Sequence, residues 1–113
     1  MRVALLHIPD CPNSRIAARL LKEILREHGL PQKIAEVSVT DFAQAEALAF
    51  TGSPTIRVDG KDVDPAYPEQ GYRGLSCRTY IVDGKRQGVP SHAIISLAIR
   101  SAFSVDRTKL EES

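Results

Sequence analysis

The order of apolar patterns in the first forty residues most strongly limits the fold that this chain can adopt. Arg2–Ile8 is an apolar run, which is typical of a strand covered on both faces. Pro9 ends this run, and a helical pattern then continues to Gly29, a residue type that commonly follows the end of a helix. Lys33–Val39 alternates and ends in β-branched residues, as a second strand does. A strand, a helix and a strand in succession predict a right-handed parallel crossover.

The helical pattern from Asn13 onward predicts which side of that helix faces the interior. Ile16, Leu20 and Ile24 recur at every fourth position beside further apolar residues, so we expect them on the buried stripe. The opposite face carries charged side chains, which are Arg15, Arg19, Lys22, Glu23, Arg26 and Glu27. This division is typical of an amphipathic helix.

The middle of the chain predicts a short helix followed by a hairpin. Thr40 is placed to cap a helix over the segment DFAQAEALAF, which is rich in strong helix formers and ends at a Gly-Ser-Pro sequence. Thr55–Val58 predicts a third strand. It runs into Asp59-Gly60, a strong signal for a two-residue hairpin, so Lys61–Val63 is expected to return beside it.

The last part of the chain predicts a loop, a second hairpin and a final helix. Asp64–Gly74 is loop-like, and Cys77–Val82 reads as a strand that meets another Asp-Gly pair. Ser91 is placed to cap the last helix. The apolar stripe of that helix comprises Ile94, Ile95, Ala98, Ile99, Ala102 and Phe103. Residues 105–113 are polar and are expected to form a frayed tail.

These elements predict an α/β fold with the order β-α-β-α-β-β-α and an inserted loop or strand before the last helix. We expect a small mixed sheet with helices on both faces, formed by a single domain over residues 1–104. The net charge of +1 gives no reason to expect binding to nucleic acid or to a membrane. The start of the chain does not resemble a signal peptide, so a cytoplasmic location is expected.

Two cysteines, Cys11 and Cys77, are the residues most suited to chemistry. Thiols in a cytosolic chain stay reduced unless redox chemistry is their role. Two cysteines cannot form the usual cysteine-rich zinc site, and the histidines show no ligand spacing with them. We therefore expect no metal site of that kind and no cofactor.

Three motifs, in order and on the expected element types, carry a resemblance to a known fold. Cys11-Pro12-Asn13-Ser14 lies at the first strand–helix junction, Ser53-Pro54-Thr55 precedes the third strand, and the segment GLSCR.Y spans Gly74–Tyr80. Together they resemble the thioredoxin-like superfamily, and within it a group of small, largely uncharacterised bacterial proteins. The resemblance covers nearly the whole chain up to Phe103. The same fold supports oxidoreductases, transferases and binding modules.

The resemblance implies a site built from the first two motifs. Cys11 would take the position of the active-site cysteine, with a substrate contacting Pro12, Ser14, Ser53, Pro54 and Thr55. A cis Ser53-Pro54 bond is implied, which would leave the backbone groups of Ser53 available to an extended peptide or to glutathione. The motif departs from the C-x-x-C of thioredoxin, because Ser14 stands at the second cysteine position.

Cys11 is expected at a helix N-terminus, where free N–H groups and the helix dipole favour a thiolate. Pro12 suits the first helical turn, since it has no N–H to leave unpaired. Asp10 opposes the thiolate. Ser14 either donates its hydroxyl to the thiolate or only completes the first turn. The alternative for Cys11 itself is a buried, inert cysteine.

The position of Cys77 decides whether Cys11 has a partner thiol, since the two are 66 positions apart. If Asp59-Gly60 forms the tight hairpin, the chain returns toward Cys11 and Cys77 approaches it, which is the arrangement we favour. If Cys77–Val82 instead pairs directly with the third strand, Cys77 lies more than about ten ångströms away.

The sequence thus predicts a thiol–disulfide redox protein. Cys11 attacks a disulfide and Cys77 resolves the product, with protein or low-molecular-weight thiols and disulfides as partners. If Cys77 is out of reach, an external thiol must resolve it. Two alternatives remain open, namely a soft-metal pair made by the two thiolates and a thioredoxin-like interaction module with an idle cysteine.

Overall fold

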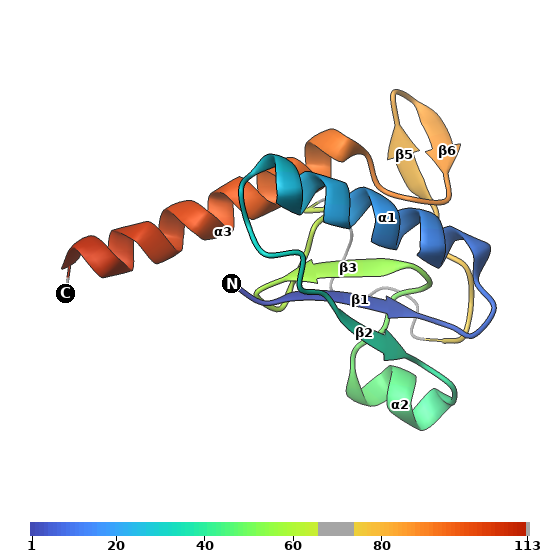
Figure 1. Cartoon of the computed structure of the whole chain (residues 1–113). Helices are drawn as coiled ribbons and strands as arrows, with labels where there is room; N and C mark the ends of the chain where they lie inside the picture. The colour runs from blue at the N-terminus through green and yellow to red at the C-terminus, as the bar shows by residue number, and fades with distance from the viewer. Residues whose placement is uncertain (66–73, 113) are drawn as a thin grey trace.

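The computed structural model describes residues 1–65 and 74–112, with the backbone alone from residue 104 onward. Its elements follow the predicted order and are shown in Figure 1. In chain order they are β1 (Val3–His7), α1 (Pro12–Glu27), β2 (Ala35–Ser38), α2 (Phe42–Ala47), β3 (Thr55–Val58), β4 (Lys61–Asp62), β5 (Tyr80–Val82), β6 (Lys85–Gln87) and α3 (His92–Glu112).

The central sheet is mixed and has the strand order β2-β1-β3-β4. Strand β1 is parallel to β2, with Ala4 opposite Ala35, and antiparallel to β3, with Leu5 opposite Ile56. Strand β4 adds to β3 as an antiparallel edge. The parallel pairing predicted for the first two strands is confirmed, and so is the mixed α/β sheet.

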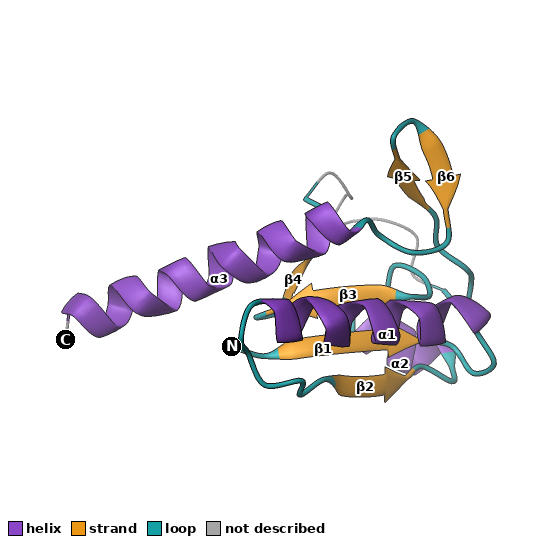
Figure 2. Cartoon of the chain, turned by 45° about the horizontal axis from the view of Figure 1, so that its top comes forward, coloured by secondary structure: helices purple, strands orange, loops and turns teal. Residues whose placement is uncertain are grey.

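Helices cover both faces of this sheet, as predicted. In Figure 2, α1 lies in front of the sheet and α2 behind it. On the α1 side, α1 and α3 pack on β1 and β3 around a buried core formed by Val3, Leu5, Ala17, Leu21, Ile24, Leu25, Ile56, Val58, Val63, Ile95 and Ile99. On the α2 side, a smaller core is formed by Leu6, Val39, Ala45 and Phe50.

Helix α1 buries a narrower stripe than its sequence predicts. Ile24 is buried and Leu20 is half-buried, but Ile16 is 52% exposed, so its predicted burial is wrong. The buried side instead follows Ser14, Ala17, Leu21, Ile24 and Leu25. The apolar residues of α1 span a wider arc than the sheet covers, and Ile16 lies at the uncovered margin.

The cap of α2 differs from the prediction by one residue. Asp41, rather than Thr40, is the N-cap, and its carboxylate accepts a hydrogen bond from the Gln44 N–H at 2.7 Å. Thr40 contributes through its own N–H, which donates to the Gln44 side-chain oxygen at 2.9 Å. A carboxylate is at least as good a cap as a hydroxyl, which explains why the helix begins after Asp41.

Helix α3 begins as predicted and ends later. The Ser91 hydroxyl accepts a hydrogen bond from the Ile94 N–H at 3.1 Å, which confirms the cap. Phe103 is 50% exposed, because α3 has by then run beyond the sheet (Figure 1). The helix continues to Glu112, through the segment expected to be a frayed tail, which contains no glycine or proline to stop it. The domain boundary at residue 104 stays a prediction.

Both predicted Asp-Gly hairpins are confirmed. Asp59 and Gly60 have φ of 51° and 81°, and Asp83 and Gly84 have φ of 53° and 78°. Positive φ at both central residues is the signature of the tight turn that suits two twisted strands. The second hairpin joins β5 to β6 as a separate two-stranded sheet, shorter than the predicted strand from Cys77. Most of the predicted loop Asp64–Gly74 lies outside the described residues.

None of the helices in the described ranges has both the length and the apolar content that a bilayer span requires.

Candidate functional site

Cys11 lies at the end of the connection between β1 and α1. It is the N-cap residue of α1 and is only 6% exposed, and Pro12 follows it at the first helical position. The preceding residue, Asp10, has φ of 60°, which turns the chain sharply into the helix. The prediction that Cys11 stands at a helix N-terminus is confirmed.

Ser14 takes the structural role of the two that its sequence position allows. Its hydroxyl is buried and donates to the backbone carbonyl of Cys11 at 2.7 Å. The Ser14 N–H points to the same carbonyl at 3.2 Å. The serine at the second cysteine position therefore closes the first helical turn by bonding to the backbone of Cys11.

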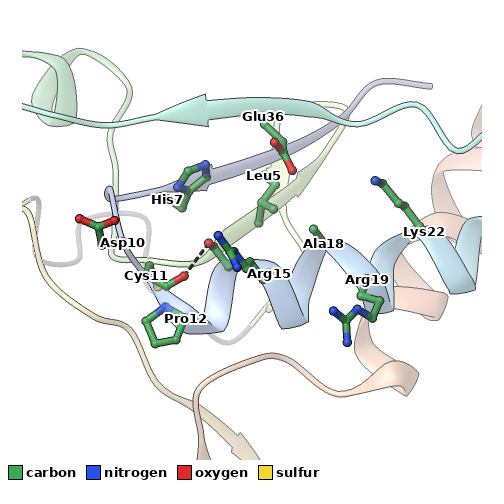
Figure 3. A pocket seen from close by; sticks show the side chains of 11 residues that line it. Leu5, His7, Asp10, Cys11, Pro12, Arg15, Ala18, Arg19, Lys22 and Glu36 are labelled. Atoms are coloured by element: carbon green, nitrogen blue, oxygen red, sulfur yellow. Dashed lines mark hydrogen bonds between the residues drawn. The ribbon is translucent and has the colours of Figure 1, made fainter.

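A hollow of about 720 Å³ opens beside Cys11, between α1 and the strands β1 and β2. Figure 3 shows it from close by, with Asp10 and Pro12 at the Cys11 end and Glu36 on the strand side. His7 is half-buried and lines the hollow, and its Nδ1 lies 3.1 Å from the Ile8 carbonyl oxygen. A hollow of this size is within the range of small-molecule sites.

The Ser53-Pro54 segment lies beside the end of β1. The Ser53-Pro54 bond is cis, as the resemblance implies. The Ser53 hydroxyl accepts a hydrogen bond from the Ile8 N–H at 3.1 Å, which ties this segment to the strand that leads into Cys11. Ser53, Pro54 and Thr55 are all buried, whereas Pro12 is exposed.

Cys77 lies directly against this segment. Ser53 and Cys77 form an isolated parallel bridge, in which the Ser53 N–H donates to the Ser76 carbonyl and the Arg78 N–H donates to the Ser53 carbonyl, both at 2.9 Å. The backbone groups of Ser53 are therefore occupied by the chain itself. The prediction that an external peptide or glutathione would find them available is wrong, because Ser76–Arg78 fills that place.

Of the two positions predicted for Cys77, the one near the Cys11 end of the sheet is confirmed. The partners of β3 within the sheet are β1 and β4, so the segment from Cys77 is not its direct neighbour in the ladder. Both cysteines are free thiols, and Cys11 is buried whereas Cys77 is exposed. Ser53 links the Cys77 segment to Ile8, three residues before Cys11 in the chain.

A buried arginine holds the Cys77 segment in place. The Arg78 guanidinium donates to the Asp62 carboxylate at 2.6 and 3.0 Å, and to the hydroxyls of Thr51 and Thr55 at 3.1 and 3.3 Å. Its carbon Cζ lies 4.4 Å from the centre of the Tyr80 ring. Because a buried charge must be paired, this network fixes the backbone beside Cys77.

Sequence reasoning missed this role of Arg78. The GLSCR segment that carries the resemblance contains it, and this was the signal that could have drawn attention to it. Tyr80 adds a second tie, since its hydroxyl donates to the Pro54 carbonyl. Through these bonds, Arg78 and Tyr80 hold the Cys77 segment against Thr51, Pro54 and Thr55.

Gly52 allows the two segments to approach closely. Its φ is +122°, and a Cβ atom built on it would lie 2.7 Å from the Arg78 Cβ. Any residue other than glycine would push Arg78, and with it Cys77, away from Ser53.

Arg57 adds a second cation beside Asp62. Burial lowers the pKa of Arg57, an effect that Asp62 opposes and Arg78 reinforces. The side chain stays charged, as arginine does in proteins. Its guanidinium donates to the carbonyls of Leu48 and Ala49 at 2.8 and 2.9 Å, which joins β3 to the end of α2.

In the described part of the chain, no group of three or more His, Cys, Asp or Glu side chains lies together in a way that could hold a metal ion. Comparison with models of protein families, with curated proteins and with solved structures found no match for this chain.

Proposed function

We propose that this chain is a thioredoxin-like thiol–disulfide redox protein in which Cys11 is the nucleophile and Cys77 the resolving thiol. The observation that carries the proposal is the bridge between Ser53 and Cys77, beside a segment hydrogen-bonded to the end of β1. This bridge brings the Cys77 segment to the end of the sheet from which β1 leads into Cys11. The strand order, the cis-proline segment and the cysteine at the start of α1 support the thioredoxin-like assignment.

The proposed reaction has two exchange steps. The Cys11 thiolate attacks one sulfur of a disulfide, which forms a mixed disulfide on Cys11 and releases the other sulfur as a thiolate. The Cys77 thiolate then attacks the Cys11 sulfur and releases the second thiol. The substrate gains two electrons and is reduced to two thiols, while Cys11 and Cys77 are oxidised to one disulfide.

The two roles follow from the surroundings of the two thiols. Cys11 caps a sixteen-residue helix, whose dipole favours a negative charge at this end. Cys77 is exposed and lies in a bridge between two non-helical segments. A cysteine at a helix start suits the role of nucleophile, and a second cysteine at the same end of the sheet suits that of the resolving thiol.

The test uses 4,4′-dithiodipyridine, a neutral disulfide that releases a coloured thiopyridone. The reduced wild-type chain is expected to release two equivalents and to retain no adduct, because Cys77 displaces the group held on Cys11. Cys77→Ser should release one equivalent and retain one pyridyl group on Cys11. Cys11→Ser should react more slowly, at Cys77 alone. Released thiopyridone and protein mass are measured together.

Two results would contradict the proposal. Retention of two pyridyl groups by the wild-type chain would show that the thiols react independently. Faster reaction of Cys11→Ser than of Cys77→Ser would reverse the roles of the two cysteines. Circular dichroism of both variants checks that they keep the wild-type fold.

A further inference from the structure

A row of cations follows α1 away from Cys11. Its members are Arg15, Arg19, Lys22 and Arg26, which we call the α1 cation row. At 3.6 residues per turn they fall within an arc of about 60° on the helix surface. All four side chains are exposed. Within the described residues, none of the four has a hydrogen-bond or ion-pair partner.

This arrangement disfavours the helix that carries it. Like charges three or four positions apart on a helix repel one another. Two acidic residues also lie on α1. Glu23 stands four positions after Arg19 and three before Arg26, so it offsets part of this repulsion. Glu27 pairs with His92 of α3 at 2.8 Å. The charged α1 residues that line the hollow beside Cys11 are nevertheless all cations.

Three of the four members of the α1 cation row lie on one wall of the hollow beside Cys11. Arg15, Arg19 and Lys22 line that hollow together with Cys11 itself. Figure 3 shows these three side chains following one another along α1, with Glu36 across from them on β2 and Asp10 at the Cys11 end. The helix wall is therefore cationic, while the carboxylates lie on the other sides. A fitting ligand is anionic on the side that faces α1.

The spacing of the row fits an extended polypeptide. At 1.5 Å per residue, successive members are about 6, 4.5 and 6 Å apart along the helix, and the row spans about 16 Å. In an extended chain, side chains on the same side recur about every 6.6–6.8 Å. Long, flexible arginine and lysine side chains accommodate that difference. A small dicarboxylate would reach only two of the four cations.

We propose that the hollow along α1 binds an extended polypeptide segment with acidic side chains at alternate positions, and presents its disulfide to Cys11. This inference names a partner for the proposed redox site. Presentation of a disulfide to Cys11 rests on the proposed function, whereas binding of the acidic segment does not. It also agrees with the state of Ser53, whose backbone cannot receive an external peptide because it is already paired with Ser76–Arg78.

Binding is tested without any redox step. A labelled peptide Glu-Thr-Glu-Thr-Glu-Thr-Glu and its all-Gln counterpart are titrated with the reduced wild-type chain, and fluorescence anisotropy is measured at low and high salt. The acidic peptide should bind, its affinity should fall as salt rises, and the Gln peptide should bind more weakly. Arg15→Gln/Arg19→Gln should weaken binding about 2- to 30-fold, as expected for two exposed ion pairs.

The matched control is Lys85→Gln/Arg86→Gln, which removes the same charge from the exposed strand β6. It should change the affinity less than twofold. Equal losses in both variants, or no difference between the two peptides, would overturn the proposed site. Tighter binding of single-stranded DNA through the same two arginines would overturn the assignment to a polypeptide.

The two proposals fail separately. If the dithiodipyridine stoichiometry holds but the acidic peptide does not bind, the binding site is wrong and the redox function stands. If the peptide binds through Arg15 and Arg19 but the stoichiometry fails, the redox function is wrong. If both hold, a disulfide placed at one end of the acidic peptide should be reduced faster than in the Gln peptide.

Discussion

Arg78 carries a charge into a part of the molecule where an unpaired charge would be costly. Its bonds to Asp62, Thr51 and Thr55 compensate for that burial and simultaneously fix the backbone on one side of Cys77. The residue next to a reactive group thus decides where that group lies. In this chain the position of Cys77 depends on a neighbour that performs no chemistry.

At the residue scale, Gly52→Ala is expected to destabilise the fold more than Gly29→Ala. Both glycines have positive φ, so both substitutions introduce backbone strain. Only at Gly52 would the new Cβ meet the Arg78 side chain, which adds about 1–3 kcal/mol of overpacking. Urea denaturation of the two variants measures the difference.

Gly29→Ala reports backbone strain without a steric contact, because a Cβ at that position meets nothing within 4 Å. The strain itself is smaller there, since φ of +69° lies in the left-handed region that other residues sometimes adopt and φ of +122° at Gly52 does not. Equal losses of unfolding free energy in the two variants would show that Arg78 moves aside freely. The contact with Gly52 would then have no part in positioning Cys77.

The residue scale also shows where sequence reasoning reached its limit. The position of Cys11 at a helix start follows from local patterns, because an apolar run, a proline and a helical stripe are adjacent in the chain. The burial of Arg78 depends on Asp62 and on the threonines of another segment, which only the folded chain brings together. No local pattern contains that information.

At the element scale, the two Asp-Gly hairpins were predictable because turn chemistry is local. The residues at which elements begin and end were less predictable, as α2 shows. The cap moved from Thr40 to Asp41 because two good capping residues stand side by side and only one of them has a carboxylate in reach of the Gln44 N–H. The exposed margin of α1 at Ile16 likewise depends on how far the sheet extends, which the periodicity of one helix does not reveal.

A pair of substitutions tests the cap of α2. Asp41→Ala should lower the free energy of unfolding by about 1 kcal/mol, because it removes the acceptor for the Gln44 N–H. Thr40→Ala should change it by less than about 0.5 kcal/mol, since it removes only an exposed hydroxyl bond to the Gln44 side chain and leaves the Thr40 N–H bond in place. Urea denaturation of both variants distinguishes the two positions. A larger loss of unfolding free energy for Thr40→Ala than for Asp41→Ala would show that Thr40 is the cap, as the sequence first indicated.

At the scale of the whole molecule, the order and pairing of the elements were predictable, and the meeting of distant segments was only partly so. A strand, helix and strand in succession leave few arrangements, which is why the mixed sheet was foreseen. Two routes for the segment from Cys77 remained open, because the choice depends on contacts with Ser53 across the fold. The occupied backbone of Ser53 was not foreseen for the same reason.

Oxidation of the reduced chain gives a prediction at this scale. A bond between Cys11 and Cys77 would close a loop of 66 residues, which in the chain-entropy treatment stabilises the fold by about 4 kcal/mol. The oxidised wild-type chain should therefore need more urea to unfold than the reduced one, while Cys77→Ser should show no such difference. A lower unfolding free energy after oxidation would mean that the bond distorts the native arrangement.

The pairing of Ser53 with Ser76–Arg78 also sets a minimum affinity that an external strand would need in order to pair with Ser53. The competing segment belongs to the same chain and is held within reach, so its effective concentration at Ser53 is of the millimolar order typical of short tethers. An external strand of ordinary weak affinity would have to displace a competitor that never diffuses away. An extended peptide of weak affinity is therefore excluded from the backbone of Ser53. A partner has to be recognised by surfaces that the chain leaves uncovered.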